Sequence, residues 1–152
     1  MLALELAERL LCEGPEGENS CGLCSSCHLV SNSVHPQLHV LIPESLIEES
    51  HPVARVHAQR YLEPGRSTQK RKLSEQISVD STRLLSETLL TTVAAKGRKV
   101  VLIIGADAMN RNAANAMLKV LEEPTARTRF SLVSSSSDNI LLIMIEPSWF
   151  TW

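Results

Sequence analysis

The sequence predicts an α/β fold with a mainly parallel sheet, and two observations predict it. Segments with the composition of strands alternate along the chain with segments of helical periodicity, which is the pattern of an α/β layered domain. Residues 100–104 form a continuous run of Val, Leu and Ile, as expected for a strand buried on both faces of a parallel sheet. A chain of 152 residues suits one domain.

The first helix is expected at residues 1–11, where Leu2, Leu6 and Leu10 recur every four residues. This helix would begin at the first residue without a cap or a preceding turn, so we expect the chain to begin partway through an element. A buried strand is expected at residues 35–43, "HPQLHVLIP", because its apolar centre is bounded by prolines.

Residues 44–76 have no usable period and are rich in His, Pro, Arg, Lys and Ser, which predicts a long loop or insertion. The cations of this segment could contact phosphate, since local Lys and Arg clusters supply the sequence-independent part of nucleic-acid affinity. The alternative is an ordinary solvated loop. The cations are Arg60, Arg66, Lys70, Arg71 and Lys72.

The next helix is expected to be capped by Asp80 or Ser81 and to end at Gly97. Its apolar side is formed by Leu84, Leu85, Leu89 and Val93. The buried strand at residues 100–104 follows this helix.

A further helix is expected to start at Asn110 or Asn112 and to stop at Pro124. Its apolar residues have helical spacing and are Ala114, Met117, Leu118 and Leu121. A strand at residues 129–134 completes the alternation of strands and helices.

Charge and hydropathy exclude some function classes. The chain has 15 Lys and Arg against 17 Asp and Glu, a net charge of −2, so any DNA binding would be local. The longest apolar runs are about half of the roughly 18 residues that span a bilayer, and the first residues are acidic where a signal peptide is basic. We therefore expect a soluble cytoplasmic protein without a membrane partner.

All four cysteines lie within sixteen consecutive positions, with the spacing C-x8-C-x2-C-x2-C; they are Cys12, Cys21, Cys24 and Cys27. Disulfides, an iron–sulfur cluster and a zinc site are the alternatives. Disulfides need an oxidising compartment, and the bacterial cluster pattern has a further Cys-Pro that is missing here. Zinc is therefore favoured. With four sulfur ligands no position is left for water, so the ion would have a structural role.

Residues 98–141 resemble the AAA+ clamp-loader subunits of bacterial DNA polymerase III, and the cysteine module resembles their zinc insertion. Within this family, "HPQLHVLIPE" and "ISVDSTRLL" are more similar to the delta-prime subunits than to the tau/gamma subunits. The resemblance implies a P-loop NTPase-like parallel sheet with helices on both faces. It also implies that the family's phosphate loop would lie upstream of this chain, so that the domain is incomplete.

The resemblance divides the chain as follows. Residues 1–141 would be a partial AAA+ domain, with a zinc-binding module at residues 12–33 and an insertion at residues 44–76. Residues 142–152 would be an atypical tail, because relatives carry a Ser-Arg-Cys motif here and this sequence ends in "LLIMIEPSWFTW". A shifted reading frame or a gene fragment would explain the tail.

The resemblance also implies a role without ATP hydrolysis. Active members have Asp-Glu where this chain has Ile104 and Gly105, and no GxxxxGK[ST] motif occurs in the sequence. We therefore assign no catalytic residue. The implied partners are the tau/gamma and delta subunits, with contact to the sliding clamp and primed DNA through the complex. DNA-directed DNA polymerase (nucleotidyltransferase) activity would belong to the holoenzyme.

Lys119, Glu122 and Glu123 match a family signature on a helix that faces neighbouring subunits. Their alternative interpretation is a solvated helix end. Two further functions stay open: a fragment of a tau/gamma ATPase subunit, and a stand-alone zinc-stabilised module that binds nucleic acid.

Overall fold

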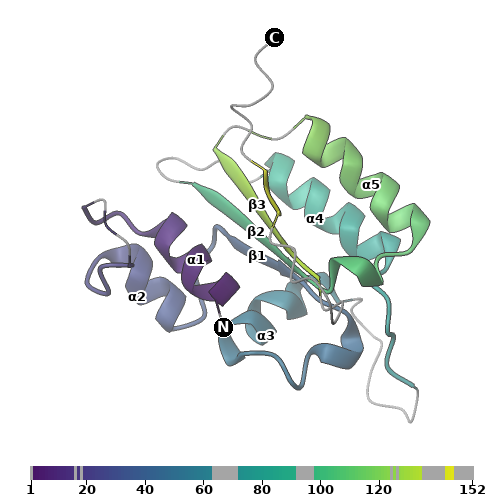
Figure 1. Cartoon of the computed structure of the whole chain (residues 1–152), viewed down its shortest axis with the longest axis horizontal. Helices are drawn as coiled ribbons and strands as arrows, with labels where there is room; N and C mark the ends of the chain where they lie inside the picture. Colours follow the sequence, from purple (N-terminus) through teal and green to yellow (C-terminus); the bar gives the residue numbers. More distant parts are fainter. Residues whose placement is uncertain are drawn as a thin grey trace.

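The computed structural model describes residues 2–15, 17, 19–62, 72–91, 98–123, 125, 127–134 and 143–145. Its centre is a four-stranded sheet in the order β1-β2-β3-β4 (Figure 1). The strands are β1 (Leu38–Leu41), β2 (Lys99–Ile104), β3 (Thr128–Val133) and β4 (Ile143–Ile145). The first three are parallel to one another and β4 is antiparallel to β3. The predicted, mainly parallel sheet is therefore confirmed.

β4 belongs to the segment that was expected to be an atypical tail. It pairs through Ser131↔Met144 and its neighbours, so part of this tail extends the sheet. The rest of residues 135–152 lies outside the described part of the chain. Among the described residues, no helix is long and apolar enough to cross a membrane.

Helices cover both faces of the sheet (Figure 1). α1 (Leu2–Leu11) and α3 (Pro52–Ala58) pack on one face, and α4 (Val79–Thr91) and α5 (Arg111–Glu122) pack on the other. The short α2 (Ser25–Ser31) lies beside α1. Single 3-10 turns occur at η1 (Glu44–Leu46), η2 (Gln59–Tyr61) and η3 (Ala106–Ala108).

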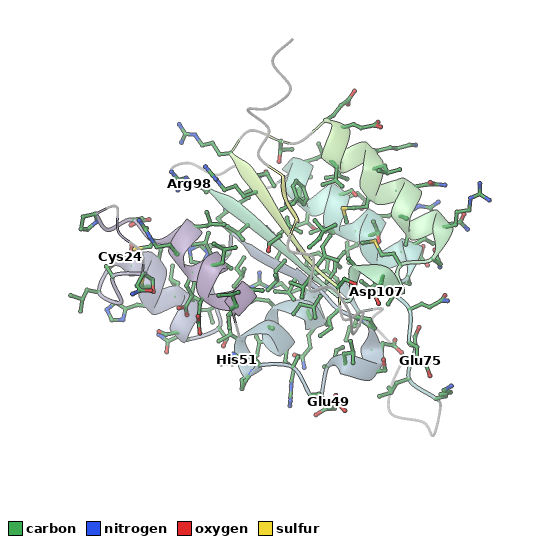
Figure 2. The ribbon with its side chains drawn as sticks, viewed as in Figure 1. Cys24, Glu49, His51, Glu75, Arg98 and Asp107 are labelled. Atoms are coloured by element: carbon green, nitrogen blue, oxygen red, sulfur yellow. The ribbon has the colours of Figure 1, made fainter. Side chains whose placement is uncertain are left out.

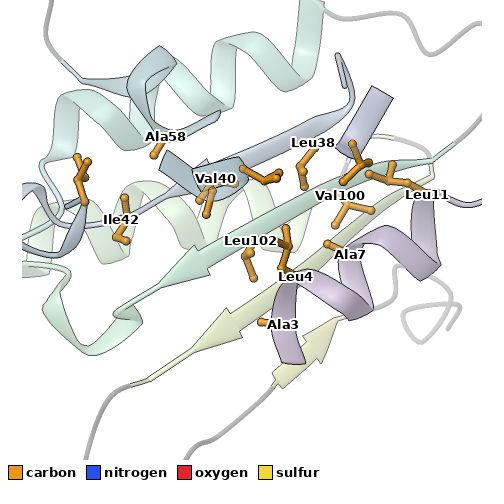
Figure 3. Close-up of a cluster of buried hydrophobic side chains, with 14 residues drawn as sticks. Ala3, Leu4, Ala7, Leu11, Leu38, Val40, Ile42, Ala58, Val100 and Leu102 are labelled. Atoms are coloured by element: carbon orange, nitrogen blue, oxygen red, sulfur yellow. The ribbon is translucent and has the colours of Figure 1, made fainter. Parts of the chain in front are cut away.

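The continuous apolar run of β2 serves two separate cores. Val100 and Leu102 pack in the first core cluster, with α1 and α3 (Figure 3). Val101 and Ile103 pack in the second, with α4 and α5. Because successive side chains of a strand point to opposite faces, a strand between two helical layers must be apolar at every position. This requirement explains why β2 is predictable from composition alone.

The buried face of α1 differs from the one that the leucine spacing predicted. Leu2 is 72% exposed, whereas Ala3, Leu4, Ala7 and Leu11 are buried. Both stripes are apolar, so the spacing did not separate them. The small side chains of Ala3 and Ala7 let α1 lie close to the sheet, and Leu4 and Leu11 pack in the same core cluster as Val100 and Leu102. A similar shift occurs in α5, where Ala113 is buried and Leu118 is half exposed.

The expectation of a long loop across residues 44–76 is wrong for residues 52–58, which form α3. His51 caps this helix, since its Nδ1 accepts a hydrogen bond from the Val53 N–H at 3.3 Å, and Pro52 occupies the first turn. The helix buries four residues: Val53, Ala54, His57 and Ala58. A helix of seven residues is too short for a clear period, and its buried histidine hides the apolar face. Residues 63–71 lie outside the described part.

Two predicted helix starts can be compared with the structure. Asn110 caps α5 as predicted, because its side-chain oxygen accepts the Ala113 N–H at 2.8 Å. The cap predicted for α4 is wrong: neither Asp80 nor Ser81 precedes the helix, and Ser78 Oγ accepts the Ser81 N–H at 3.1 Å. The predicted ends at Gly97 and Pro124 lie outside the described residues.

Three buried polar side chains lie around β1 and β2. His39 Nδ1 is 2.5 Å from the Tyr61 hydroxyl, and His57 is fully buried in α3. Burial lowers the pKa of both histidines to about 4. Lys99 is 4% exposed, and its Nζ donates to the Leu89 carbonyl oxygen at 2.6 Å, near the end of α4. Burial also lowers the pKa of Lys99.

Gly105, which follows β2, is expected to accept a side chain only with a loss of stability. Its φ is 73°, in the left-handed region, and an added Cβ would lie 3.3 Å from two ring atoms of Pro43. Gly105→Ala should lower the free energy of unfolding by about 1–2 kcal/mol in urea titrations. Gly17→Ala is the control, since an added Cβ there would meet only the Pro15 oxygen, at 4.0 Å. Equal losses in the two variants would contradict this prediction.

Candidate metal centre

The four cysteine sulfur atoms converge at one end of α1 and α2. All four lie within 4.8 Å of one another. The Cys24 sulfur is 3.4 Å from that of Cys27 and 3.9 Å from that of Cys12, and the Cys21 and Cys27 sulfurs are 3.9 Å apart. These separations exceed the roughly 2.05 Å of a disulfide, and all four cysteines are free. The spacing in the sequence therefore corresponds to one cluster in space.

The separations fit a tetrahedral metal ion. Zinc–sulfur bonds of about 2.3 Å at tetrahedral angles place neighbouring sulfurs about 3.8 Å apart. Three of the sulfur–sulfur distances, at 3.4 Å, 3.9 Å and 3.9 Å, lie close to this value. Four soft thiol ligands favour zinc or iron–sulfur chemistry over magnesium or calcium. The donor set therefore suits the ion that the spacing predicted.

Backbone N–H groups point at three of the sulfurs. Cys12 Sγ accepts from the N–H groups of Gly14 and Cys21, both at 3.3 Å. Cys21 Sγ accepts from the Cys24 N–H, and Cys24 Sγ from the Cys27 N–H, both at 3.4 Å. Such donors stabilise a thiolate over a thiol. The backbone around the cluster therefore presents hydrogen-bond donors to its sulfur atoms.

The pKa values of three of the cysteines are shifted, in directions that depend on the donors and the burial around each sulfur. The Cys27 and Glu13 backbone N–H groups lower the pKa of Cys24 to about 6. The N–H groups of Cys21 and Gly14 lower that of Cys12. Burial, followed by the neighbouring Cys24 side chain, raises the pKa of Cys27 to about 12. Four adjacent thiolates repel one another, and a divalent cation at their centre would remove this repulsion.

The loops around the cluster depend on two glycines with different roles. An added Cβ at Gly14 would lie 2.8 Å from Cys21 Cβ and 2.9 Å from its sulfur. Gly22 has a φ of 68° and no atom within 4 Å of an added Cβ. Gly14 thus allows the close approach of Cys12 and Cys21, whereas Gly22 forms the tight turn between Cys21 and Cys24.

Gly14→Ala is expected to weaken metal binding about 5- to 150-fold, because the methyl group would displace the cluster at an overpacking cost of about 1–3 kcal/mol. Gly17→Ala is the control and should leave metal affinity close to that of the parent, since an added Cβ there would meet only the Pro15 oxygen, at 4.0 Å. Competition with a chromophoric chelator measures both affinities. A Gly14→Ala chain with unchanged affinity would show that the loop relaxes.

His28 follows Cys27 in the sequence, but it is exposed on α2 and is not among the clustered ligands. The other predicted site residues are not gathered at the cluster. Lys119, Glu122 and Glu123 are exposed at the end of α5. Lys119 and Glu123 line a groove of about 570 Å³ between α4 and α5. Nothing in the structure tests whether these three residues contact another subunit, so this role stays a prediction.

The predicted phosphate contacts lie mostly beyond the described residues. Arg66, Lys70 and Arg71 fall in the segment that the structure leaves out. Lys72 is described, and its Nζ lies 2.9 Å from a carboxylate oxygen of Glu75, with both side chains exposed. An exposed ion pair of this kind is weak, but it reduces the net positive charge that Lys72 could offer to a phosphate.

Sequence reasoning missed the polar residues beside the cluster. Ser25 and Ser26 donate to the two carboxylate oxygens of Glu13, and Ser26 also contacts His35. The only available sign was position: Glu13 follows Cys12, the serines lie between Cys24 and Cys27, and His35 begins the segment that leads to β1. These residue types are too common for such a position to suggest a contact.

The cysteine cluster is distant from the carboxyl end of β2. Figure 2 places Cys24 on the side of the molecule where Arg98 precedes β2, and Asp107 at the other end of this strand. In open α/β sheets, ligands bind beyond the carboxyl ends of the strands. The cluster lies away from that edge, as expected for a centre that supports the fold.

Comparison with known proteins gives a consistent match. A family model described as DNA polymerase III, delta subunit, matches residues 1–145. The DNA polymerase III subunit delta' of Pseudomonas aeruginosa is 35% identical over 140 residues, covering 92% of this chain and 34% of the relative. The subunit of the same name from Escherichia coli is 32% identical over 140 residues, with 92% and 34% covered. The chain thus spans about a third of the length of these relatives.

Among solved structures, a DNA polymerase III gamma-subunit-related protein from Thermotoga maritima is 22% identical, with a TM-score of 0.37. The superposition covers 70% of this chain and 38% of that protein. This similarity is too low to support a comparison of the two folds.

Proposed function

Since this chain belongs to the family of DNA polymerase III delta' subunits, we propose that it acts in the clamp loader. This complex opens the sliding clamp and sets it on primed DNA during replication in the bacterial cytoplasm. The match of the family model to residues 1–145 carries the proposal. The proposed partners are the tau/gamma and delta subunits, and the sliding clamp and primed DNA are contacted through the complex.

The proposed fold is a partial AAA+ domain over residues 1–141, with residues 12–33 as its zinc module and residues 44–76 as an insertion. Three parallel strands with helices on both faces support this assignment. The cysteine module follows α1 and precedes β1, so it would be an insertion between a helix and the next strand of that fold.

The proposed role involves no ATP hydrolysis by this chain. An ATPase of this class needs carboxylates at the end of the central strand to hold magnesium and to orient water. At the end of β2, Ile104 packs against the first core cluster and Gly105 adopts a left-handed conformation. Neither residue has a carboxylate. Asp107 lies further on, in the 3-10 turn Ala106–Ala108.

The experiment is reconstitution of the chain with purified tau/gamma and delta subunits, followed by size-exclusion chromatography and an ATPase assay. We expect a complex that contains the chain and no ATP hydrolysis by the chain alone. Hydrolysis by the isolated chain would contradict the proposal and favour a tau/gamma-type ATPase. Failure to enter the complex, together with salt-dependent binding to bare DNA, would favour a stand-alone nucleic-acid-binding module.

Lys119→Glu, near the end of α5, is expected to lower the affinity of the chain for tau/gamma by roughly tenfold. Lys119, Glu122 and Glu123 form the proposed subunit interface, and the substitution reverses the charge of one of them. Arg111→Glu is the matched control: it makes the same charge change at the exposed start of α5. Titration of a labelled chain with tau/gamma measures both affinities. Equal losses in the two variants would mean that overall charge, and not this helix end, determines the affinity.

The proposed cofactor is one structural Zn²⁺ ion held by Cys12, Cys21, Cys24 and Cys27. Their convergence supports this set of ligands. Four sulfur ligands leave no position for water, so the ion would hold the end of α1 against the start of α2 and would catalyse no reaction.

A further inference from the structure

A continuous chain of hydrogen bonds joins β1 to the cysteine cluster. The Gln37 N–H donates to His35 Nδ1 at 3.1 Å, and His35 Nε2 lies 3.3 Å from Ser26 Oγ. Ser26 Oγ in turn donates to a carboxylate oxygen of Glu13 at 3.1 Å. Gln37 is itself fixed to the sheet, since its carbonyl accepts the Val100 N–H at 2.9 Å.

Only one arrangement of hydrogens satisfies all of these contacts. A backbone N–H can only donate, so Nδ1 of His35 must accept and the hydrogen of the neutral ring must be on Nε2. This N–H then donates to the Ser26 oxygen, which leaves the Ser26 hydroxyl hydrogen for Glu13, an acceptor. Every donor therefore has an acceptor, and each bond fixes the direction of the next.

The chain of bonds is shielded from water at its centre. His35 is 4% exposed and Ser26 is 5% exposed. A buried polar group that loses its partner has no water to replace it, so breaking one bond costs more than the bond's net strength. The positions of His35 and Ser26 are therefore set by each other.

The far end of the chain contacts the cluster through Glu13. Glu13 directly follows Cys12 in the sequence, and Ser25 and Ser26 directly follow Cys24. The Glu13 carboxylate is held by Ser26 and also by Ser25, at 3.1 Å each. These bonds therefore tie the segment that contains Cys12 to the segment that contains Cys24.

We infer that His35 is a positioning residue for the metal centre, which acts through Ser26 and Glu13 to hold the Cys12 and Cys24 segments together against β1. This inference rests on the proposed zinc site. Partners that orient metal ligands in this way raise metal affinity, and their loss typically weakens it about 10- to 100-fold.

Two amide variants separate this role from simple support of the turn before β1. The asparagine oxygen can occupy the place of Nδ1, so His35→Asn keeps the bond to Gln37 and loses the bond to Ser26. The glutamine nitrogen can occupy the place of Nε2, so His35→Gln keeps the donor to Ser26. A turn-supporting role favours asparagine, and a metal-positioning role favours glutamine.

The test measures Zn²⁺ affinity by chelator competition, and the absorption bands of the Co²⁺-loaded chain as a second readout. His35→Asn should bind Zn²⁺ about 10- to 100-fold more weakly than the parent and shift the Co²⁺ bands, and His35→Gln should restore most of the affinity. Ser26→Ala should lower the Zn²⁺ affinity as much as His35→Asn does. The double variant His35→Asn/Ser26→Ala should bind Zn²⁺ no more weakly than either single variant. His28→Asn, on the exposed side of α2, is the control and should match the parent.

The outcomes distinguish the two proposals. A parent chain that binds no Zn²⁺ overturns the metal site and this inference with it. A parent that binds Zn²⁺, with unchanged affinity in His35→Asn, overturns the positioning role alone. Equal affinities of His35→Asn and His35→Gln, or additive losses in the double variant, overturn it as well. If His35→Asn does not fold, the comparison of Ser26→Ala with the parent decides.

Discussion

Cys24→Ser is expected to abolish stoichiometric zinc binding and to lower the free energy of unfolding by about 4 kcal/mol, when free zinc stands about a thousandfold above its dissociation constant. Cys24 is central to the cluster. Its sulfur lies 3.4 Å from that of Cys27 and 3.9 Å from that of Cys12, and it caps α2 by accepting the Cys27 N–H. A serine oxygen is a poor substitute for a thiolate toward zinc.

The physical reason is that metal binding and folding are coupled. Apparent zinc-binding free energies in small zinc peptides are about 10–16 kcal/mol at neutral pH, and the module buries little apolar surface of its own. Of α2, only Ser26, Cys27 and Val30 are buried. A chelator should therefore lower the melting temperature of the parent and leave that of Cys24→Ser unchanged.

Elemental analysis for zinc per chain and thermal melts with and without chelator measure this effect. Leu23→Ser is the matched control, since Leu23 lies in the same loop and is 83% exposed. It should retain one zinc ion and the parent's response to chelator. One zinc ion per chain in Cys24→Ser, or stoichiometric iron with visible absorbance in the parent, would contradict the zinc assignment.

Acidification from pH 6.5 to pH 4 is expected to destabilise the chain by up to about 3 kcal/mol for each of His39 and His57. Burial, reinforced by the charge of Arg60, lowers both pKa values to about 4 from the ordinary value of 6.5. Between these pH values the unfolded chain binds protons that the folded chain does not. The stabilising contribution is thus complete above pH 6.5 and is lost as the pH falls toward 4.

His57→Leu removes the contribution of one of the two histidines to this pH dependence. The difference in unfolding free energy between pH 8 and pH 5, measured by urea titration, should be smaller in His57→Leu than in the parent. Val56→Leu is the control, on the half-exposed side of α3, and should retain the parent's pH dependence. Metal release at low pH would affect all three chains alike. Identical pH dependence in His57→Leu and the parent would show that His57 titrates normally.

The elements that were predicted correctly are those whose own residues indicate how they are buried or capped. β2 is apolar at every central position because helices cover both of its faces, and Asn110 is an N-cap of the preferred type. α3 was missed because one buried face in seven residues contains His57. The face of α1 was wrong because two stripes are apolar and only the sheet selects between them.

In the candidate site, the cysteine ligands were predictable from the sequence and the polar contacts beside them were not. The C-x8-C-x2-C-x2-C spacing was sufficient to predict that the four sulfurs converge, because two short turns limit where the thiols can lie. The contacts of His35 with Ser26, and of Ser26 with Glu13, join residues that are nine and thirteen positions apart. Such contacts depend on how α1, α2 and β1 pack, and no local pattern in the sequence encodes that packing.

Lys99 offers a way to observe the second core open. Its amine is enclosed at the end of α4, bonded to the Leu89 carbonyl, and 4% exposed, so an acylating reagent can reach it only after α4 separates from β2. Lys119, exposed on α5, is available at all times. The rate at which Lys99 is acylated, relative to Lys119, therefore measures how often α4 separates from β2 under native conditions.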